Sequence, residues 1–190
     1  MSRLSLSAVT CFSLIVFFHT HVSFANGFWW QALLSDKPLT EVREVIKQGG
    51  EWYECDAFNQ MTVMCLDEFY YYNIALYGEL TLRNQSMTLS FLTAYDAQTL
   101  SDLILNLRKD GFVVSALDIG DEHYDVREAL QQQSPESVDR DVVLLMNQYP
   151  QDAPRTLDWL RAQEFEASLP KVKANLTSDG EMLELTITRL

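Results

Sequence analysis

Alternating apolar and polar positions are the main pattern of this chain, and residues 52–95 carry the clearest examples. The run 69–82 alternates with a period of two residues, and the run 87–95 does the same, which predicts two β-strands. The polar segment 83–86 is short enough to turn the chain back between them. Residues 52–95 therefore predict an antiparallel sheet with one apolar face.

Helical periodicity flanks this sheet on both sides. Residues 28–33 and 38–48 carry apolar side chains at helical spacing, and together they predict a helical hairpin within 26–50. Residues 96–110 give the strongest helix signal, because Asp96 can cap the first turn and Gly111 follows the last one. The N-terminal hairpin is expected to cover the sheet, with Trp29 and Trp30 in the core.

The second half of the chain mixes both patterns. Residues 112–119 and the continuous apolar run 142–146 predict buried strands, whereas 152–166 predict a helix. A loop at 120–125 is expected to lead into a weaker helix at 124–132, and alternation over 172–187 predicts a C-terminal hairpin. The whole pattern indicates an α+β fold of one domain, with a mixed, mainly antiparallel sheet and helices packed on one face.

The first 25 residues have the features of a signal peptide. Arg3 precedes the apolar run 8–18, and small residues at Ser23 and Ala25 suit cleavage after Ala25. The apolar run is too short to cross about 30 Å of hydrocarbon as an anchor. We therefore expect a single α+β domain of residues 26–190 in the periplasm, or outside the cell as an alternative, with no integral membrane segment after cleavage.

Charge narrows the classes of partner. Cleavage removes only Arg3 from the 14 Lys and Arg residues, so 13 remain against 27 Asp and Glu residues and the net charge becomes −14. Such a surface repels nucleic acid and anionic lipid and suits a basic protein partner. The simpler alternative is that the acidic surface only keeps an exported protein in solution.

The two cysteines that follow the leader, Cys55 and Cys65, predict a disulfide. An even count in an oxidising compartment favours pairing, and the bridge would close a loop of about ten residues, worth ~2–3 kcal/mol of unfolding free energy. The spacing is not that of a C-x-x-C redox or metal pair.

Motifs of catalysis and of cofactor binding are missing from the sequence. His123 lies in the acidic loop that holds Asp118, Asp121, Glu122 and Asp125, but this loop lacks the calcium-binding pattern. No nucleophile elbow, P-loop or dinucleotide fingerprint is present. We expect a solvated acidic turn that can contact a basic partner, with neither a cofactor nor a metal.

The aromatic residues around position 70 allow two interpretations. A single strand cannot bury Phe69 and Tyr71 on the same face as Tyr70 and Tyr72, so one pair either contacts a partner or lies under the N-terminal helices. The alternation is compatible with both interpretations. The candidate partner-binding residues are Asp56, Asp67, Glu68, Phe69, Tyr71, Glu79, Asp121, Glu122, His123 and Asp125.

Compartment, charge and the missing motifs together favour a non-enzymatic binding protein. The specific hypothesis is an inhibitor or immunity-type protein that neutralises a basic secreted toxin or cell-wall hydrolase. The alternatives are a periplasmic envelope assembly or signalling factor, and a hydrolase or metal-binding protein that uses residues 118–125. The sequence identifies neither the partner nor the oligomeric state.

Overall fold

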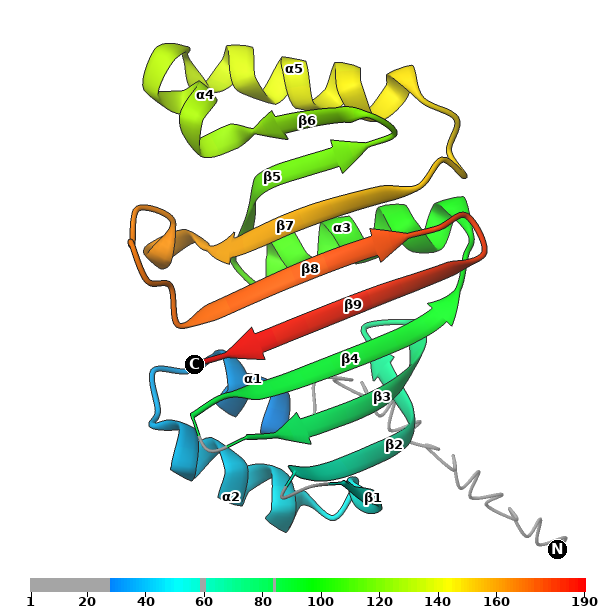
Figure 1. Ribbon diagram of the computed structural model, residues 1–190, viewed down its shortest axis with the longest axis vertical. Coiled ribbons are helices and arrows are strands. Elements are labelled where there is room, and N and C mark those ends of the chain that lie inside the picture. The colour runs from blue at the N-terminus through cyan, green and yellow to red at the C-terminus, as the bar shows by residue number, and fades with distance from the viewer. Residues whose placement is uncertain (1–27, 59–60, 84) are drawn as a thin grey trace, which may run out of the picture.

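One antiparallel sheet organises the computed structural model, which describes residues 28–58, 61–83 and 85–190 (Figure 1). Its strands run in the order β1-β2-β3-β4-β9-β8-β7-β5-β6, and every neighbouring pair is antiparallel. The predicted α+β class is confirmed, while the predicted signal peptide lies outside the described residues. The strands are β1 (Tyr53–Phe58), β2 (Met61–Tyr71), β3 (Ile74–Leu82), β4 (Met87–Ala94), β5 (Phe112–Ile119), β6 (Glu122–Asp125), β7 (Arg155–Arg161), β8 (Val172–Ser178) and β9 (Met182–Arg189).

The helices leave one face of the sheet uncovered in the described part of the chain. Helices α1 and α3 lie behind the strands in Figure 1, α2 continues from α1, and α4 and α5 lie along the β5–β6 edge. No helix among the described residues is long and apolar enough to cross a membrane. The helices are α1 (Phe28–Leu34), α2 (Leu39–Gly49), α3 (Ala97–Lys109), α4 (Val126–Gln132) and α5 (Pro135–Gln148), with the short 3-10 helix η1 (Ala162–Glu164).

Side-chain alternation places the core between the sheet and the helices. In β3, β4, β8 and β9 every second side chain is buried against the helices, and those between them face outward. Trp29 and Trp30 of α1 pack on Phe69, Tyr71 and Phe91 with ring centroids 4.9–6.2 Å apart. The N-terminal helices therefore cover the sheet as predicted. We call the uncovered side the open face.

The predicted single strand 69–82 is two strands. Tyr71 pairs with Ile74 across a two-residue turn, where Tyr72 has a left-handed φ of 58°. A β-bulge between Leu66 and Phe69 then shifts the register of β2 against β3. The sequence hides this turn because tyrosine is an unusual turn residue and the apolar alternation continues across it.

Two of the element types predicted for the second half of the chain are wrong. Residues 142–146 belong to α5 rather than to a strand, and much of 152–166 is strand β7 followed by η1 rather than a helix. In addition, the predicted loop 120–125 ends in the short strand β6, which pairs with β5. The helices at 28–34, 39–49 and 97–109 and the C-terminal hairpin are confirmed.

Candidate binding surface on the open face

One row of side chains crosses seven strands of the open face. Directly paired residues on neighbouring strands lie within about 5.5 Å of each other, so the row spans roughly 30 Å. We call it the central row. Its members, from β3 to β6, are Tyr77, Leu92, Glu184, Thr177, Thr156, Asp118 and His123.

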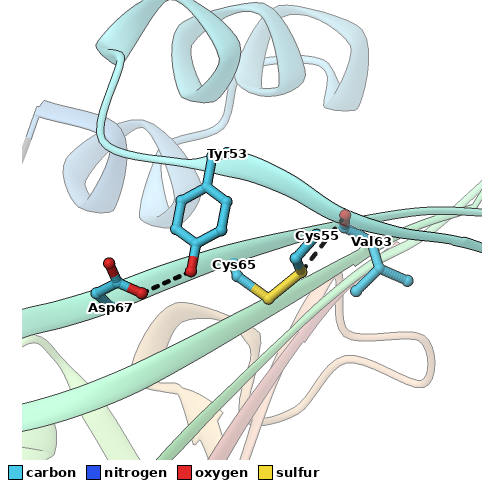
Figure 2. Close-up of a disulfide and its surroundings, with 5 residues drawn as sticks. All are labelled: Tyr53, Cys55, Val63, Cys65 and Asp67. Carbon is cyan, nitrogen blue, oxygen red and sulfur yellow. Dashed lines mark hydrogen bonds between the residues drawn. A yellow bond between two sulfur atoms is a disulfide. The ribbon is translucent and has the colours of Figure 1, made fainter.

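Three exposed tyrosines and three carboxylates gather at the β1–β3 end of this face. Tyr53, Tyr70 and Tyr77 are 48%, 50% and 61% exposed, although tyrosine normally buries much of its ring. Tyr53 donates a hydrogen bond to Asp67 Oδ1 at 2.5 Å, and Figure 2 shows this pair beside the disulfide. We call this the tyrosine–acid surface: Tyr53, Asp67, Glu68, Tyr70, Tyr77 and Glu79.

Carboxylate neighbours raise the pKa of two of these tyrosines. The hydrogen bond to Asp67 raises the pKa of Tyr53, and the hydrogen bond to Glu68 raises that of Tyr70. A protonated phenol that is held by a carboxylate presents an oriented ring face. The carboxylate keeps lone pairs for other donors. The surface therefore offers flat apolar area and anionic acceptors together, which suits lysine and arginine side chains.

Phe69 and Tyr71 are not part of this surface. They are 6% and 0% exposed because α1 covers them, so the structure bears out the covered interpretation of this aromatic face. The bulge in β2 and the turn after Tyr71 reverse the faces that simple alternation gives. The aromatic side chains that point outward are instead Tyr53, Tyr70 and Tyr77. The sequence analysis did not propose these three as partner-binding residues.

The predicted disulfide is present at the edge of the same surface. Cys55 and Cys65 are bonded, with their Cα atoms 5.7 Å apart, and join edge strand β1 to β2 (Figure 2). The β1–β2 register shifts between Glu54 and Asp56, next to Cys55. The side chain of Asp56 lies outside the described part of the structure. The covalent bond holds the strand that carries Tyr53 against its neighbour.

A hollow of about 430 Å³ lies on the open face at one end of strands β9, β8, β7 and β5, beside the β8–β9 turn. Its wall combines carboxylates from three parts of the chain with exposed apolar side chains, and Leu92 and Met182 are 42% and 40% exposed. We call it the acidic hollow. Among the residues that line it are Leu92, Asp118, Pro154, Asp179, Met182 and Glu184.

The predicted acidic loop separates into side chains with different directions. His123 Nδ1 lies 2.7 Å from Asp118 Oδ1, and this contact raises the pKa of His123. Asp125 caps α4 by accepting from the Glu128 N–H at 2.9 Å, whereas Glu122 accepts from Gln148 of α5 at 3.2 Å. Asp121 is exposed in the turn. Of the four candidate partner-binding residues in this loop, only His123 belongs to the central row, where it pairs with Asp118.

Sequence reasoning missed the acidic hollow. Leu92, Met182 and Glu184 lie in strands that the alternation predicted, but their proximity depends on β4 pairing with β9. Asp118 joins them only because β7 and β8 lie between β9 and β5. Strand pairing over such sequence distances leaves no local signal, so alternation alone could not find the hollow.

The described residues thus define an α+β protein with one open, acidic sheet face. No three His, Cys, Asp or Glu side chains in the described ranges converge as a metal site requires. No protein family, no curated protein and no solved structure matches the chain.

Proposed function

We propose that this chain is an exported, non-enzymatic protein that binds a basic protein partner with the open face of its sheet. The observation that carries the proposal is the tyrosine–acid surface, where three half-exposed tyrosines lie among carboxylates on an uncovered sheet. Exposed aromatic side chains on a rigid scaffold are typical anchors of protein interfaces. Their acidic surroundings select a basic partner.

Charge supports the choice of partner. The processed chain carries about 14 more acidic than basic side chains by the sequence count, and the open face includes Glu79, Asp118 and Glu184. Lys173 is a basic side chain on the same face. Such a field attracts cationic proteins over distances of about a Debye length, ~10 Å at 0.1 M salt.

The finer proposal is an inhibitor or immunity-type protein of the periplasm. A wide sheet face that combines aromatic anchors and carboxylates can cover the cleft of a basic toxin or cell-wall hydrolase. The disulfide is compatible with export to an oxidising compartment. An envelope assembly or signalling factor would use the same face, and the identity of the captured protein separates these two functions.

A capture experiment with matched variants tests this proposal. The processed chain is immobilised at low salt and exposed to envelope extract of the source cells. The surface variant Glu68→Gln, Tyr77→Ala, Glu79→Gln is compared with the control Glu44→Gln, Leu105→Ala, Glu128→Gln. The control removes the same charge and one exposed apolar side chain from the helices.

The expected result is a basic protein that wild type and the control retain and that the surface variant binds at least ~10-fold more weakly, as for the loss of an interface hot spot. Equal retention by all three chains would contradict the proposal. Loss of a catalytic activity in His123→Gln, with the fold unchanged, would favour the hydrolase alternative.

A further inference from the structure

We propose that the acidic hollow receives a long cationic side chain, arginine or lysine, from the basic partner. This inference rests on the proposed function and names the chemistry of the anchor. The hollow lies on the central row between the tyrosine–acid surface and His123, so a partner that covers the row also covers the hollow. Its volume of about 430 Å³ falls within the ~300–1,000 Å³ range of ligand sites.

The apolar part of the wall is the first argument. Leu92 and Met182 come from the neighbouring strands β4 and β9 and point to the same face, because Leu92 pairs with Glu184, two residues from Met182. Both are at least 40% exposed, and Pro154 lines the hollow with them. Exposed apolar side chains in a concave site mark a place where a partner packs. The methylene stem of arginine or lysine supplies the matching apolar surface.

Charge complementarity is the second argument, because it favours a cationic group at the end of that stem. Glu184, Asp179 and Asp118 line the hollow from β9, the β8–β9 turn and β5. Glu184 Oε1 accepts from Ser90 at 2.9 Å and from Thr186 at 3.3 Å, and no hydrogen bond to its Oε2 is found among the described residues. Asp118 and Asp179 likewise accept hydrogen bonds through Oδ1, from His123 and from the backbone N–H groups of Glu181 and Met182. A neutral apolar side chain offers no donor to the second oxygens of these three carboxylates, whereas a cation does.

The arginine in the wall does not neutralise the hollow. Arg155 is 6% exposed, and its guanidinium donates to the backbone carbonyls of Pro150 and Ala153 at 2.6 and 3.1 Å. Its hydrogen bonds therefore hold the loop before β7 rather than a carboxylate of the hollow. Three carboxylates against one guanidinium leave the site with net negative charge.

Methyl NMR of the processed chain tests the inference without knowledge of the partner. The Met182 and Leu92 methyl signals are followed during titration with N-acetyl-arginine amide, N-acetyl-lysine amide and the neutral isostere N-acetyl-citrulline amide. We expect saturable shifts with arginine, lysine or both, and at least tenfold weaker binding of citrulline. The stronger of the two cations identifies the anchor residue.

Matched variants separate the hollow from general surface charge. Glu184→Gln keeps an acceptor for Ser90 and Thr186, so we expect the same fold with at least fivefold weaker binding of the cation. Glu128→Gln on α4 removes equal charge away from the hollow and should leave binding unchanged. Equal responses to all three amides, or no methyl response to either cation, would overturn the inference.

The two proposals fail separately. Methyl shifts with a cation, in the absence of any protein captured through the tyrosine–acid surface, would leave the hollow standing and refute the proposed function. Capture of a basic protein through the tyrosine–acid surface, without methyl shifts, would support the proposed function and refute the inference about the hollow.

Discussion

At the scale of single residues, the carboxylate of Asp110 joins three elements through its hydrogen bonds. It accepts from Trp30 Nε1 of α1 at 3.0 Å, from the hydroxyl of Tyr71 at the end of β2 at 2.8 Å, and from that of Tyr72 in the following turn at 2.9 Å. Asp110 itself is the C-cap of α3. Burial, followed by the charge of Asp110, raises the pKa of Tyr71 far above its ordinary value.

Removal of this carboxylate should weaken the fold. Asp110→Ala leaves the buried Tyr71 hydroxyl and the Trp30 N–H without their acceptor, so we expect the free energy of unfolding to fall by ~2–4 kcal/mol. Asp102→Ala, on the exposed side of the same helix, should cost less than about 1 kcal/mol. Urea denaturation measures both, and equal costs would contradict the role of Asp110.

His123 gives the fold a pH-dependent contribution. Hydrogen bonding to Asp118 comes first among the causes that raise its pKa above the ordinary value of 6.5, followed by the charges of Asp118, Asp125 and Asp158. The charged histidine is therefore favoured in the folded state. Its stabilising effect is complete below the unfolded pKa and disappears as the pH rises through the folded pKa.

Two measurements check this effect. The His123 pKa from NMR titration should lie above 6.5 in wild type and decrease in Asp118→Asn. In urea denaturation, the stability lost in His123→Gln should be larger at pH ~5 than at pH ~8.5, on either side of the ordinary histidine pKa. If the stability lost in His123→Gln increased with pH instead, the predicted direction of the His123 effect would be wrong.

Residue-level prediction from the sequence succeeded where chemistry is local. The disulfide follows from an even cysteine count, and the exposure of Asp67, Glu68 and Glu79 follows from their charge. It left two interpretations of Phe69 and Tyr71 open, because the bulge and the two-residue turn change which face each side chain occupies. A one-residue change of register reverses the face of every later side chain in a strand.

At the scale of elements, the short helix α1 depends on arginines of the sheet. The buried guanidinium of Arg189 in β9 donates to the carbonyls of Ala32 and Leu33 in the last turn of α1 and to those of Ser35 and Lys37 just after it. Arg161 of β7 donates to the carbonyl of Leu34 at 3.1 Å. The last carbonyls of a helix have no partners inside it, and cations near this end also interact favourably with the helix dipole.

Arg189→Met should therefore weaken the packing of α1 against the sheet. Because four carbonyl contacts in a buried site are lost, we expect a cost of ~3–5 kcal/mol and faster amide hydrogen exchange in α1. Lys173→Met on the exposed side of β8 should change stability by less than about 0.5 kcal/mol. Unchanged exchange in α1 would contradict this role of Arg189.

Element types were predictable where periodicity and end signals agree. Helix α3 has the Asp96 cap and a basic last turn, and the C-terminal hairpin alternates on both strands. In α5 the run 142–146 is apolar throughout, although Val143 and Leu144 are more than half exposed, so composition hides the helical face. In β7 the apolar residues at 157, 159 and 160 fit the periodicity of a helix as well as that of a strand. Pairing with β5 and β8 makes this segment a strand.

At the scale of the whole molecule, sheet order creates the candidate site. Tyr77, Glu184 and Asp118 come from distant parts of the chain, and the pairings β4–β9 and β5–β7 place them in one row. The sequence analysis identified candidate residues near both ends of this row, in the two separate acidic segments 56–79 and 121–125. Their common face and the hollow between them required long-range strand pairing, which no local pattern encodes.

The central claim is that an acidic open face captures a basic protein, and the salt dependence of association tests it most directly. The association rate constant of the captured partner is measured at about 0.02 M and 0.3 M salt for wild type, the surface variant and the helix control. Wild type and the control should slow by roughly tenfold or more at the higher salt, and the surface variant should slow much less. An association rate that does not change with salt, or that changes equally for all three chains, would contradict the claim.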